Sequence, residues 1–373
     1  MGLKSHDTIK CVRNRYNTES GREWLDMKSD ENGSMRSSTK PYNLKDIFGD
    51  LVFPYWMHIC MKINSEYKLY ANSNQRLYHY TSLEGFQSIM QKRDFWISNI
   101  RYMNDSREFE NGKTICKEVI KDKLEVGDRD EIKQYLQGLW HACDQSTSQG
   151  SFKIRSGDIF ALNFCDSGDI LTQWQFYGSE GVAIGFENAT NTFDAITFMN
   201  EDQYEEEIKE TKPEEMYPHD EIRLFPNKVI YDDNKKRELF ESILDIGINF
   251  INRYSDTTDI CIEGVSDALF HYFALMKDSH FEHEHELRFF YYLNKDNKRI
   301  HFRKRNGILL PYIKMKILDV NCWPHKIFSV SDIIVAPGNR KEYVADSVKY
   351  FLEKSGYDYL IDKVRTSEIP YRN

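Results

Sequence analysis

The chain has 373 residues and a net charge of −9, with 40% hydrophobic, 14% aromatic and 29% charged residues. This composition is typical of a folded globular protein and excludes the collagen-like, low-complexity and disulfide-scaffold classes. No stretch of about 18 apolar residues occurs and the first residues lack a signal peptide's apolar segment, so we expect a cytoplasmic protein without a membrane partner. The seven cysteines stand singly, as reduced thiols do. The acidic balance disfavours broad attraction to phosphate backbones but leaves a local basic groove open.

The chain divides into an N-terminal extension over 1–72 and a main domain over 73–373. The extension begins with a polar linker and continues with the apolar segment 44–63, which we predict to be a helix broken before Pro54, followed by a second apolar turn. An insertion at about 200–222 carries ten acidic residues against two lysines. Such a run is most often a solvated surface.

Hydrophobic periodicity predicts the elements of the main domain in a mixed order of helices and strands. Strict alternation of strand and helix is absent, so we predict an α+β fold with a mixed central sheet flanked by helices. In chain order the prediction is strand 76–82, helix 83–93 capped by Ser82, strand 94–100, helix 104–124, helix 130–143, strand 158–165, helix 168–178, strand 181–187, strand 227–231, helix 235–254, helix 263–278, strand 285–293, strand 331–337 and helix 340–356 with Gly356 as its C-cap.

Signatures of phosphate-binding loops, dinucleotide folds, zincins, serine hydrolases and kinases are absent from the sequence. His280, His283 and His285 are candidate metal ligands, but nothing in the sequence identifies a fourth, and we predict no metal site. Glu207 and Lys209 form a nuclease-like pair, which falls in the acidic run where such pairs arise by chance. A nuclease or another hydrolase therefore carries little support.

A second set of residues suits recognition of a ribose and a planar ring. His79 stands on a predicted strand, Trp174 and Tyr177 lie at a helix-to-strand junction, and Glu286 stands on a late strand. Each also has a structural explanation, because aromatic residues at such spacing are usually core and a histidine between tyrosines is usually satisfied by its neighbours. Arg288 shares a strand face with Glu286, so an ion pair would explain both.

Four blocks of sequence carry a resemblance to a known family. They are RLYHYTSLEGFQSIMQKRDFWISNIRYMNDSREFENG, DIFALNFCDSGDILTQWQFYGSEGVAIGFE, FEHEHELRFFYY, and VSDIIVAPGNRKEYVADSVKYFLEKSGY with the terminal TSEIPYRN. From about Arg76 to Asn373 the chain resembles the bacterial family of uncharacterised domains DUF 2971. It departs from the family at Leu287, where Trp is frequent, and in the acidic insertion.

The opening block is also similar to ADP-ribosyltransferases of the His-Tyr-Glu type and to DarT-like DNA-modifying toxins. This similarity implies an ADP-ribosyltransferase-like core that takes NAD as its substrate. A carboxylate beside the ribose would stabilise the oxocarbenium-like state in which the nicotinamide bond breaks. The implied roles are catalysis by Glu286, ribose binding by His79 with Tyr80, Thr81 and Ser82, stacking by Tyr177 with Trp174 and Tyr102 as rivals, and ionisation of Glu286 by Arg288.

Two functions follow from these resemblances. The first is an NAD-dependent ADP-ribosyltransferase, a toxin or anti-phage effector, that transfers ADP-ribose to an unknown protein or nucleic-acid acceptor; hydrolysis of NAD is a close variant. The second is a non-catalytic sensor or interaction domain in a defence or toxin–antitoxin module, with an antitoxin or defence-complex partner. Replacing Glu286 by Gln separates them, because an enzyme loses activity with its fold intact and a packing role shows as lost stability.

Overall fold

The computed structural model divides the chain into two compact units, 1–55 and 56–373. The fold described below is that of the second, together with the first residues of α4, which start at Val52. The acidic insertion lies outside the described residues up to position 220, as do the nuclease-like pair and the chain before position 52. The structure describes residues 52–71, 75–92, 94–102, 108–127, 129–145, 157–178, 180–187, 193–197, 221–224, 226–254, 256–294, 299–305, 307–319, 326–327 and 330–370.

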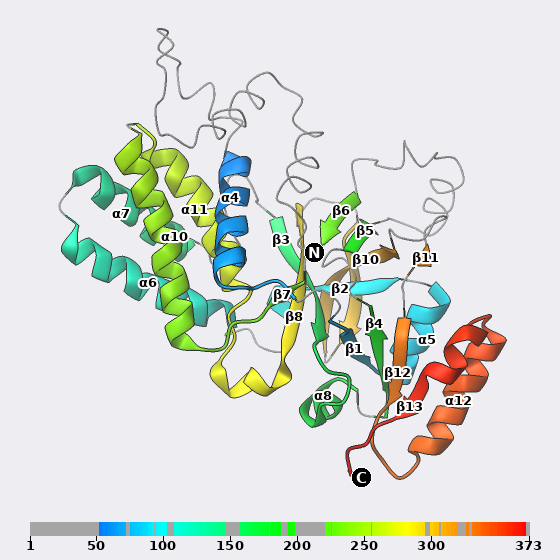
Figure 1. The fold of residues 1–373 in the computed structure, drawn as a ribbon. Helices are drawn as coiled ribbons and strands as arrows, with labels where there is room; N and C mark the ends of the chain where they lie inside the picture. The colour runs from blue at the N-terminus through cyan, green and yellow to red at the C-terminus, as the bar shows by residue number, and fades with distance from the viewer. Residues whose placement is uncertain are drawn as a thin grey trace, which may run out of the picture. The chain divides into compact units, whose positions relative to one another are not determined.

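Helices and strands alternate irregularly along the chain (Figure 1). The α-helices are α4 (Val52–Glu66), α5 (Leu83–Lys92), α6 (Glu108–Val126), α7 (Asp130–Gln145), α8 (Leu171–Phe176), α10 (Asp233–Arg253), α11 (Thr258–Phe273) and α12 (Lys341–Lys354), and the 3-10 helices are η1 (Ile100–Tyr102), η2 (Ser279–Glu284) and η3 (Asp358–Lys363). The strands are β1 (Leu77–Thr81), β2 (Phe95–Asn99), β3 (Gly157–Cys165), β4 (Val182–Phe186), β5 (Phe193–Thr197), β6 (Glu221–Leu224), β7 (Asn227–Lys228), β8 (Glu286–Asn294), β9 (His301–Arg305), β10 (Ile308–Asp319), β11 (Lys326–Ile327), β12 (Val330–Val335) and β13 (Val364–Thr366).

Within the described residues the thirteen strands join one mixed sheet. Its main path runs β13-β12-β4-β1-β3-β2-β10-β5-β6, while β8 pairs with β3 and β9 pairs with β10. The pair β12–β13 is parallel and the other pairs are antiparallel. The predicted α+β class with a mixed central sheet flanked by helices is confirmed.

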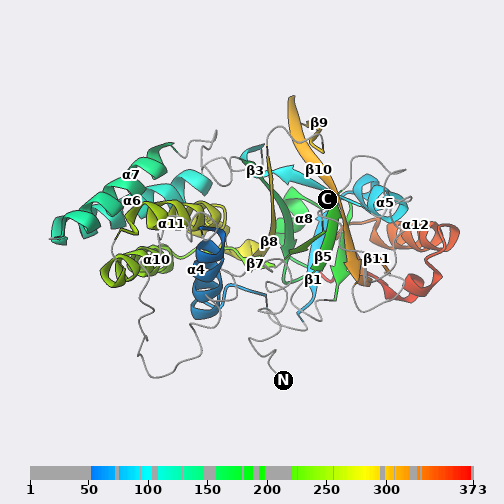
Figure 2. The ribbon, with the colours of Figure 1, turned by 90° about the horizontal axis from the view of Figure 1, so that it is seen from above.

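The two faces of the sheet carry different layers. One, here called the α5/α12 face, bears the main core, in which residues of both helices pack on alternate residues of β1, β2, β3, β4 and β8. The opposite face, here called the α8 face, bears a smaller aromatic cluster with Trp174 at its centre. Helices α6, α7, α10 and α11 pack together as a bundle on the β8 side, away from α5 and α12 (Figures 1 and 2).

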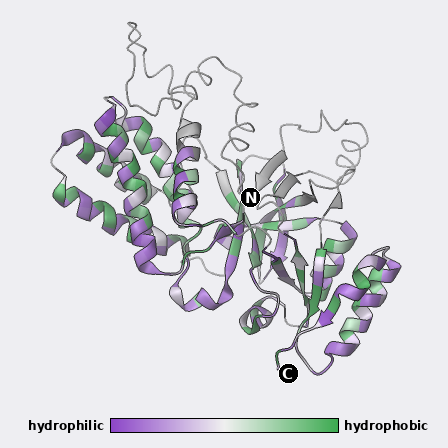
Figure 3. Cartoon of the chain, in the orientation of Figure 1, coloured by the Kyte–Doolittle hydropathy of each residue, from purple (hydrophilic) through white to green (hydrophobic). Residues whose placement is uncertain are grey.

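Most predicted elements are present, because their apolar spacing matches the face that each one buries. On α12 hydrophobic residues follow one side and hydrophilic residues the other (Figure 3), and its buried residues Ala345, Val348 and Leu352 recur at helical spacing. The predicted cap of α5 is confirmed, since the Ser82 hydroxyl accepts a hydrogen bond from the Gly85 N–H at 3.1 Å. The predicted C-cap is also confirmed, with Gly356 at a φ of 77° after α12.

Two predictions about local structure need correction. The helix α4 does not break before Pro54 but runs through it, because Pro54 is the third residue of the helix. The N–H groups of a first turn have no intrahelical acceptor, so a proline there, which lacks an N–H, removes no helical hydrogen bond. The predicted strand 227–231 is reduced to the two residues of β7, with Ile230 forming an isolated bridge to Met276. Strands β5, β6, β9, β10, β11 and β13 were not predicted.

Candidate functional site

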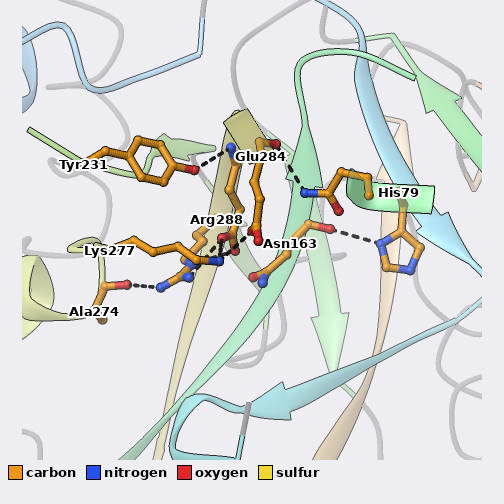
Figure 4. A network of polar contacts seen from close by, with 9 residues as sticks. His79, Asn163, Tyr231, Ala274, Lys277, Glu284 and Arg288 are labelled. Atoms are coloured by element: carbon orange, nitrogen blue, oxygen red, sulfur yellow. Dashed lines mark hydrogen bonds and ion pairs between the residues drawn. The ribbon is translucent and has the colours of Figure 1, made fainter. Parts of the chain in front are cut away.

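Glu286, the predicted catalytic carboxylate, is the first residue of β8 and is 4% exposed. It belongs to a charged cluster, the Glu286 network, which comprises Glu286, Arg288, Lys277 and Glu284 (Figure 4). Lys277 follows α11, Glu284 ends η2, and Arg288 stands two residues along β8. All four side chains are at most 5% exposed, so the network lies in the interior.

Both carboxylate oxygens of Glu286 are engaged. Arg288 donates from Nε to Oε1 at 2.7 Å and from Nη2 to Oε2 at 3.0 Å, which is the bidentate geometry of a strong guanidinium–carboxylate pair. Lys277 donates from Nζ to Oε2 at 3.1 Å and also to Oε2 of Glu284 at 2.6 Å. Two buried cations therefore balance two buried anions.

The backbone holds the network in position. The N–H of Glu286 donates to the hydroxyl of Tyr231 at 3.0 Å, and Arg288 donates from Nη1 to the carbonyl oxygen of Ala274 at 2.8 Å. His285, between η2 and β8, adopts a left-handed conformation with a φ of 49°. This turn lets β8 start directly after η2, so that two residues close in sequence both reach Lys277.

The network also fixes the protonation state of Glu286. Burial by itself raises the pKa of a carboxyl group, but the charges and hydrogen bonds of Arg288 and Lys277 outweigh it and hold the pKa of Glu286 below its ordinary 4.5. Burial, with the charge of Glu286 second, raises the pKa of the neighbouring thiol of Cys165 well above its ordinary value. Glu286 is thus ionised and Cys165 is a neutral thiol at neutral pH.

His79 projects from the other face of the sheet. Side chains alternate along a strand and paired residues share a face. His79 pairs with Ile184 and its ring meets Phe164 at 5.7 Å, and both partners belong to the core on the α5/α12 face. Glu286 pairs with Cys165, which belongs to the cluster on the α8 face. The structure does not bring His79 and Glu286 together.

His79 has a structural partner instead. Strands β1 and β3 pair only at Tyr78 and Cys165 and then separate, and the His79 ring lies where they part, with Nδ1 3.0 Å from the carbonyl oxygen of Asn163 (Figure 4). Because a carbonyl only accepts, Nδ1 carries the proton in this contact. Burial lowers the pKa of His79 from its ordinary 6.5, partly offset by this hydrogen bond, so the neutral ring is favoured.

The predicted stacking residues divide between core and surface. Trp174 is 2% exposed, meets the Tyr80 ring edge-on with 4.7 Å between centroids, and donates from Nε1 to Asp169 at 2.7 Å. Tyr177 packs against the same cluster, while Tyr102, in η1, is 42% exposed. Neither face of Trp174 or Tyr80 is therefore open to a ligand as large as nicotinamide.

The remaining predicted site residues take local roles. Thr81 lies on the α5/α12 face by alternation with His79, and Ser82 caps α5. Of the predicted site residues, Tyr80, Trp174, Tyr177 and Glu286, with Arg288 beside it, share the α8 face. There α8 also contacts η2 through a 3.3 Å hydrogen bond from the Gln173 side chain to the Glu284 carbonyl. Two of the three predicted parts of the site thus lie close together, and the third does not.

Lys277, Glu284 and Tyr231 were not predicted as members of the site. The pairing of Glu286 with Arg288 was available from their spacing on one strand, but the approach of Lys277 depends on how the chain turns between α11 and β8. The candidate ligands His280 and His283 lie on η2, and His280 contacts Asp278 at 2.5 Å. Within the described residues no group of three or more His, Cys, Asp or Glu side chains could hold a metal ion.

Comparison with known proteins identifies one segment. Residues 173–289 match the model of a family described as a protein of unknown function, DUF2971, which confirms that resemblance for the segment from α8 into β8. No curated protein and no solved structure matches the chain. Among the described helices, none combines the length and apolar character that crossing a membrane requires. The similarity to ADP-ribosyltransferases stays a prediction.

Proposed function

We propose that this protein acts by binding a partner and that Glu286 has a structural role. The observation that carries the proposal is the complete engagement of the Glu286 carboxylate, which accepts two hydrogen bonds from Arg288 and one from Lys277. Transfer from NAD needs a carboxylate that contacts the ribose, and such a contact here would first have to displace a buried cation. Displacement of one partner from a buried pair costs about 3–5 kcal/mol.

The position of His79 supports the same proposal. In the transferase, the histidine and the glutamate hold the same nucleotide, and side chains on opposite faces of one sheet cannot do so. The contact of His79 with the Asn163 carbonyl gives the histidine a structural reason to be present where β1 and β3 separate. The non-catalytic interaction domain is therefore the better supported of the two expected functions.

The transferase is the second candidate, because one observation favours it. Glu286 lies on the face that also bears α8 with Trp174 and Tyr177, the segment expected to hold nicotinamide. For this function NAD is the substrate and the acceptor is a macromolecule, and ligand binding must release Glu286 from Lys277.

Nicotinamide release from NAD separates the two functions. The full chain and its Glu286→Gln variant are incubated with NAD, each with and without a bacterial lysate as a source of acceptors, and NAD binding is measured by calorimetry. Glu282→Gln is the matched control, since Glu282 lies on η2 and is exposed. We expect neither release nor binding by any of the three proteins. Release by the wild type and the control that is lost in a folded Glu286→Gln variant would establish the transferase.

We also propose that the protein works in the cytoplasm. The five described cysteines are unbridged and buried, in keeping with a reducing compartment. Alkylation in denaturant without reductant, followed by mass spectrometry, should label all seven thiols of protein taken from its native cell. A disulfide between any two cysteines would contradict this location.

A further inference from the structure

A group of basic and aromatic residues lies on β2, β9 and β10 and at the end of α5, away from the Glu286 network. We call it the basic aromatic patch, and it comprises Lys92, Trp96, His301, Arg303, Arg305 and Tyr312. Strand register places its five strand residues on one face, because Tyr312 pairs with Ser98 on β2 and with His301 on β9, while Trp96, Arg303 and Arg305 follow by alternation. Lys92 is the last residue of α5 and joins the patch through its side chain, which reaches the Trp96 ring. Ser98 pairs in turn with Ala161 of β3, so this is the α8 face.

Two aromatic rings of the patch stack on each other, and cationic side chains lie against them. Trp96 and Tyr312 lie 4.6 Å apart with an interplanar angle of 24°. The Arg303 guanidinium lies 5.6 Å from the Trp96 ring and 5.5 Å from the Tyr312 ring, and Lys92 Nζ lies 5.8 Å from Trp96. Trp96 and Arg303 are partly exposed and Tyr312 is buried, so a ligand can reach the Trp96 ring and the guanidinium while Tyr312 supports them from below the surface.

Among the described residues no carboxylate forms an ion pair with Arg303. Its polar contact is a hydrogen bond from Nη2 to the Ser98 hydroxyl at 2.9 Å, and no ion pair of Arg303 or Arg305 occurs with any described residue. Burial, followed by the like charge of Arg305, lowers the pKa of Arg303, which is the direction expected of crowded cations. The buried carboxylate nearby is Asp94, whose charge acts on Tyr312.

Three buried nitrogen atoms of the patch have no hydrogen-bond partner among the described residues. They are Nε of Arg303, Nε1 of Trp96 and Nε2 of His301. A buried polar group without a partner is costly, and native proteins rarely keep several together. An anion bound at the exposed part of the Arg303 side chain would balance the guanidinium charge beside these unpaired donors.

We propose that the basic aromatic patch binds single-stranded nucleic acid. Arg303, Arg305 and Lys92 would contact phosphates, and a base would stack beside Trp96. Cations interleaved with flat rings on a sheet surface suit exposed bases and their backbone, whereas reading a duplex calls for an element that enters a groove. The proposal rests on the binding function proposed above and names its partner.

The test is fluorescence anisotropy of the full chain with three labelled probes of about 16 nucleotides, the upper site size of a small single-strand binding domain. The probes are oligo(U), oligo(dT) and a duplex of equal length. We expect a single strand to bind more tightly than the duplex, and the two single-stranded probes identify RNA or DNA as the source. With three phosphate contacts, the slope of log K against log salt should be about −2.

Variants locate the site. Arg303→Gln retains polar atoms for Ser98 but removes the charge, and it should weaken binding about tenfold and make the salt slope smaller by about 1. Lys304→Gln is the matched control, because Lys304 is the next residue of β9, is exposed and lies on the other face. It should change affinity less than about twofold, and both variants should retain the wild-type thermal midpoint.

Several results would overturn the proposal. These are absence of binding to either single strand at about 50 mM salt, equal binding of the duplex, preference for a poly-glutamate peptide, or equal losses in the two variants. If Arg303→Gln disturbs the fold, a second variant tests the same patch. Trp96→Leu should also weaken binding about tenfold, because it removes the stacking of a base on the ring. Nicotinamide release is measured separately. Release that depends on Glu286 would contradict the proposed binding function, whereas absence of binding to both single strands without such release would contradict only the named partner.

Discussion

Replacing Glu286 by Gln removes one of the two negative charges of the Glu286 network while keeping the shape of the side chain. Lys277 keeps Glu284 as a partner at 2.6 Å, whereas Arg288 loses its bidentate carboxylate and retains the Ala274 carbonyl. Truncating one member of a buried pair costs about 3–5 kcal/mol. Because Lys277 stays paired, we expect the lower limit, about 3 kcal/mol.

This loss is large enough to measure directly. At about 2 °C per kcal/mol, the value for the larger domains, the thermal midpoint of Glu286→Gln should fall by roughly 6 °C. Urea unfolding followed by far-ultraviolet circular dichroism gives the free energy independently. The exposed control Glu282→Gln should stay within about 0.5 kcal/mol of the wild type.

A second substitution tests whether the loss comes from the uncompensated cation. Adding Arg288→Met to Glu286→Gln removes the charge that the first change leaves unpaired, and buried pairs replaced by apolar groups are often neutral in stability. We expect the double variant to be more stable than Glu286→Gln alone. A single variant that is as stable as the wild type would refute the reasoning, and if it had also lost nicotinamide release, the carboxylate would be catalytic.

Three further substitutions test other parts of the fold. Because the pKa of His79 is lowered in the folded state, the neutral ring contributes its full stability above the ordinary pKa of 6.5, and this contribution is lost as pH falls through the lowered value. His79→Gln still offers a donor to Asn163 but does not titrate, so it should flatten the pH dependence of the free energy of unfolding below 6.5. An unchanged dependence, measured by urea unfolding at several pH values, would contradict this. Trp174→Phe removes the hydrogen bond to Asp169 and should cost about 1–2 kcal/mol in calorimetry, whereas a wild-type midpoint would show that the bond contributes nothing. Gly181→Ala places a Cβ 2.1 Å from the last carbonyl oxygen of β1 and should lower the free energy of unfolding by about 3 kcal/mol or prevent folding. A variant with wild-type stability would show that β1 and the loop at Gly181 move apart without cost.

The sequence was most informative where one element buries one regular face. Strands β3 and β4 are short, apolar and bounded by glycine or aspartate, and α10 and α12 carry apolar residues at helical spacing. Strand β10 gave no such pattern, since Pro311 interrupts it and proline argues against a central strand. Its partner β9 has the sequence HFRKR, in which charges hide the alternation that the sheet imposes.

The candidate site was less predictable because it depends on contacts between distant segments. The sequence places His79 and Glu286 on strands but does not show which face each one uses, since that depends on register with β3 and β4. A shift of one residue would reverse the face. Likewise, Lys277 reaches Glu286 only through the left-handed turn at His285, for which the sequence HEHEL carries no glycine signal.

The α8 face thus carries two charged clusters, which differ in how far carboxylates balance their positive charges. In the Glu286 network two cations match two carboxylates within hydrogen-bonding distance, so its field largely cancels a short distance away. In the basic aromatic patch Arg303 and Arg305 reinforce each other without an acidic partner among the described residues, within a chain of net charge −9. A partner drawn by electrostatic attraction to this face would therefore be guided to the patch, while the remaining acidic surface would repel nucleic acid bound elsewhere. On this contrast we propose recognition at β9 and β10, with the Glu286 network joining β8 to the helices beside it.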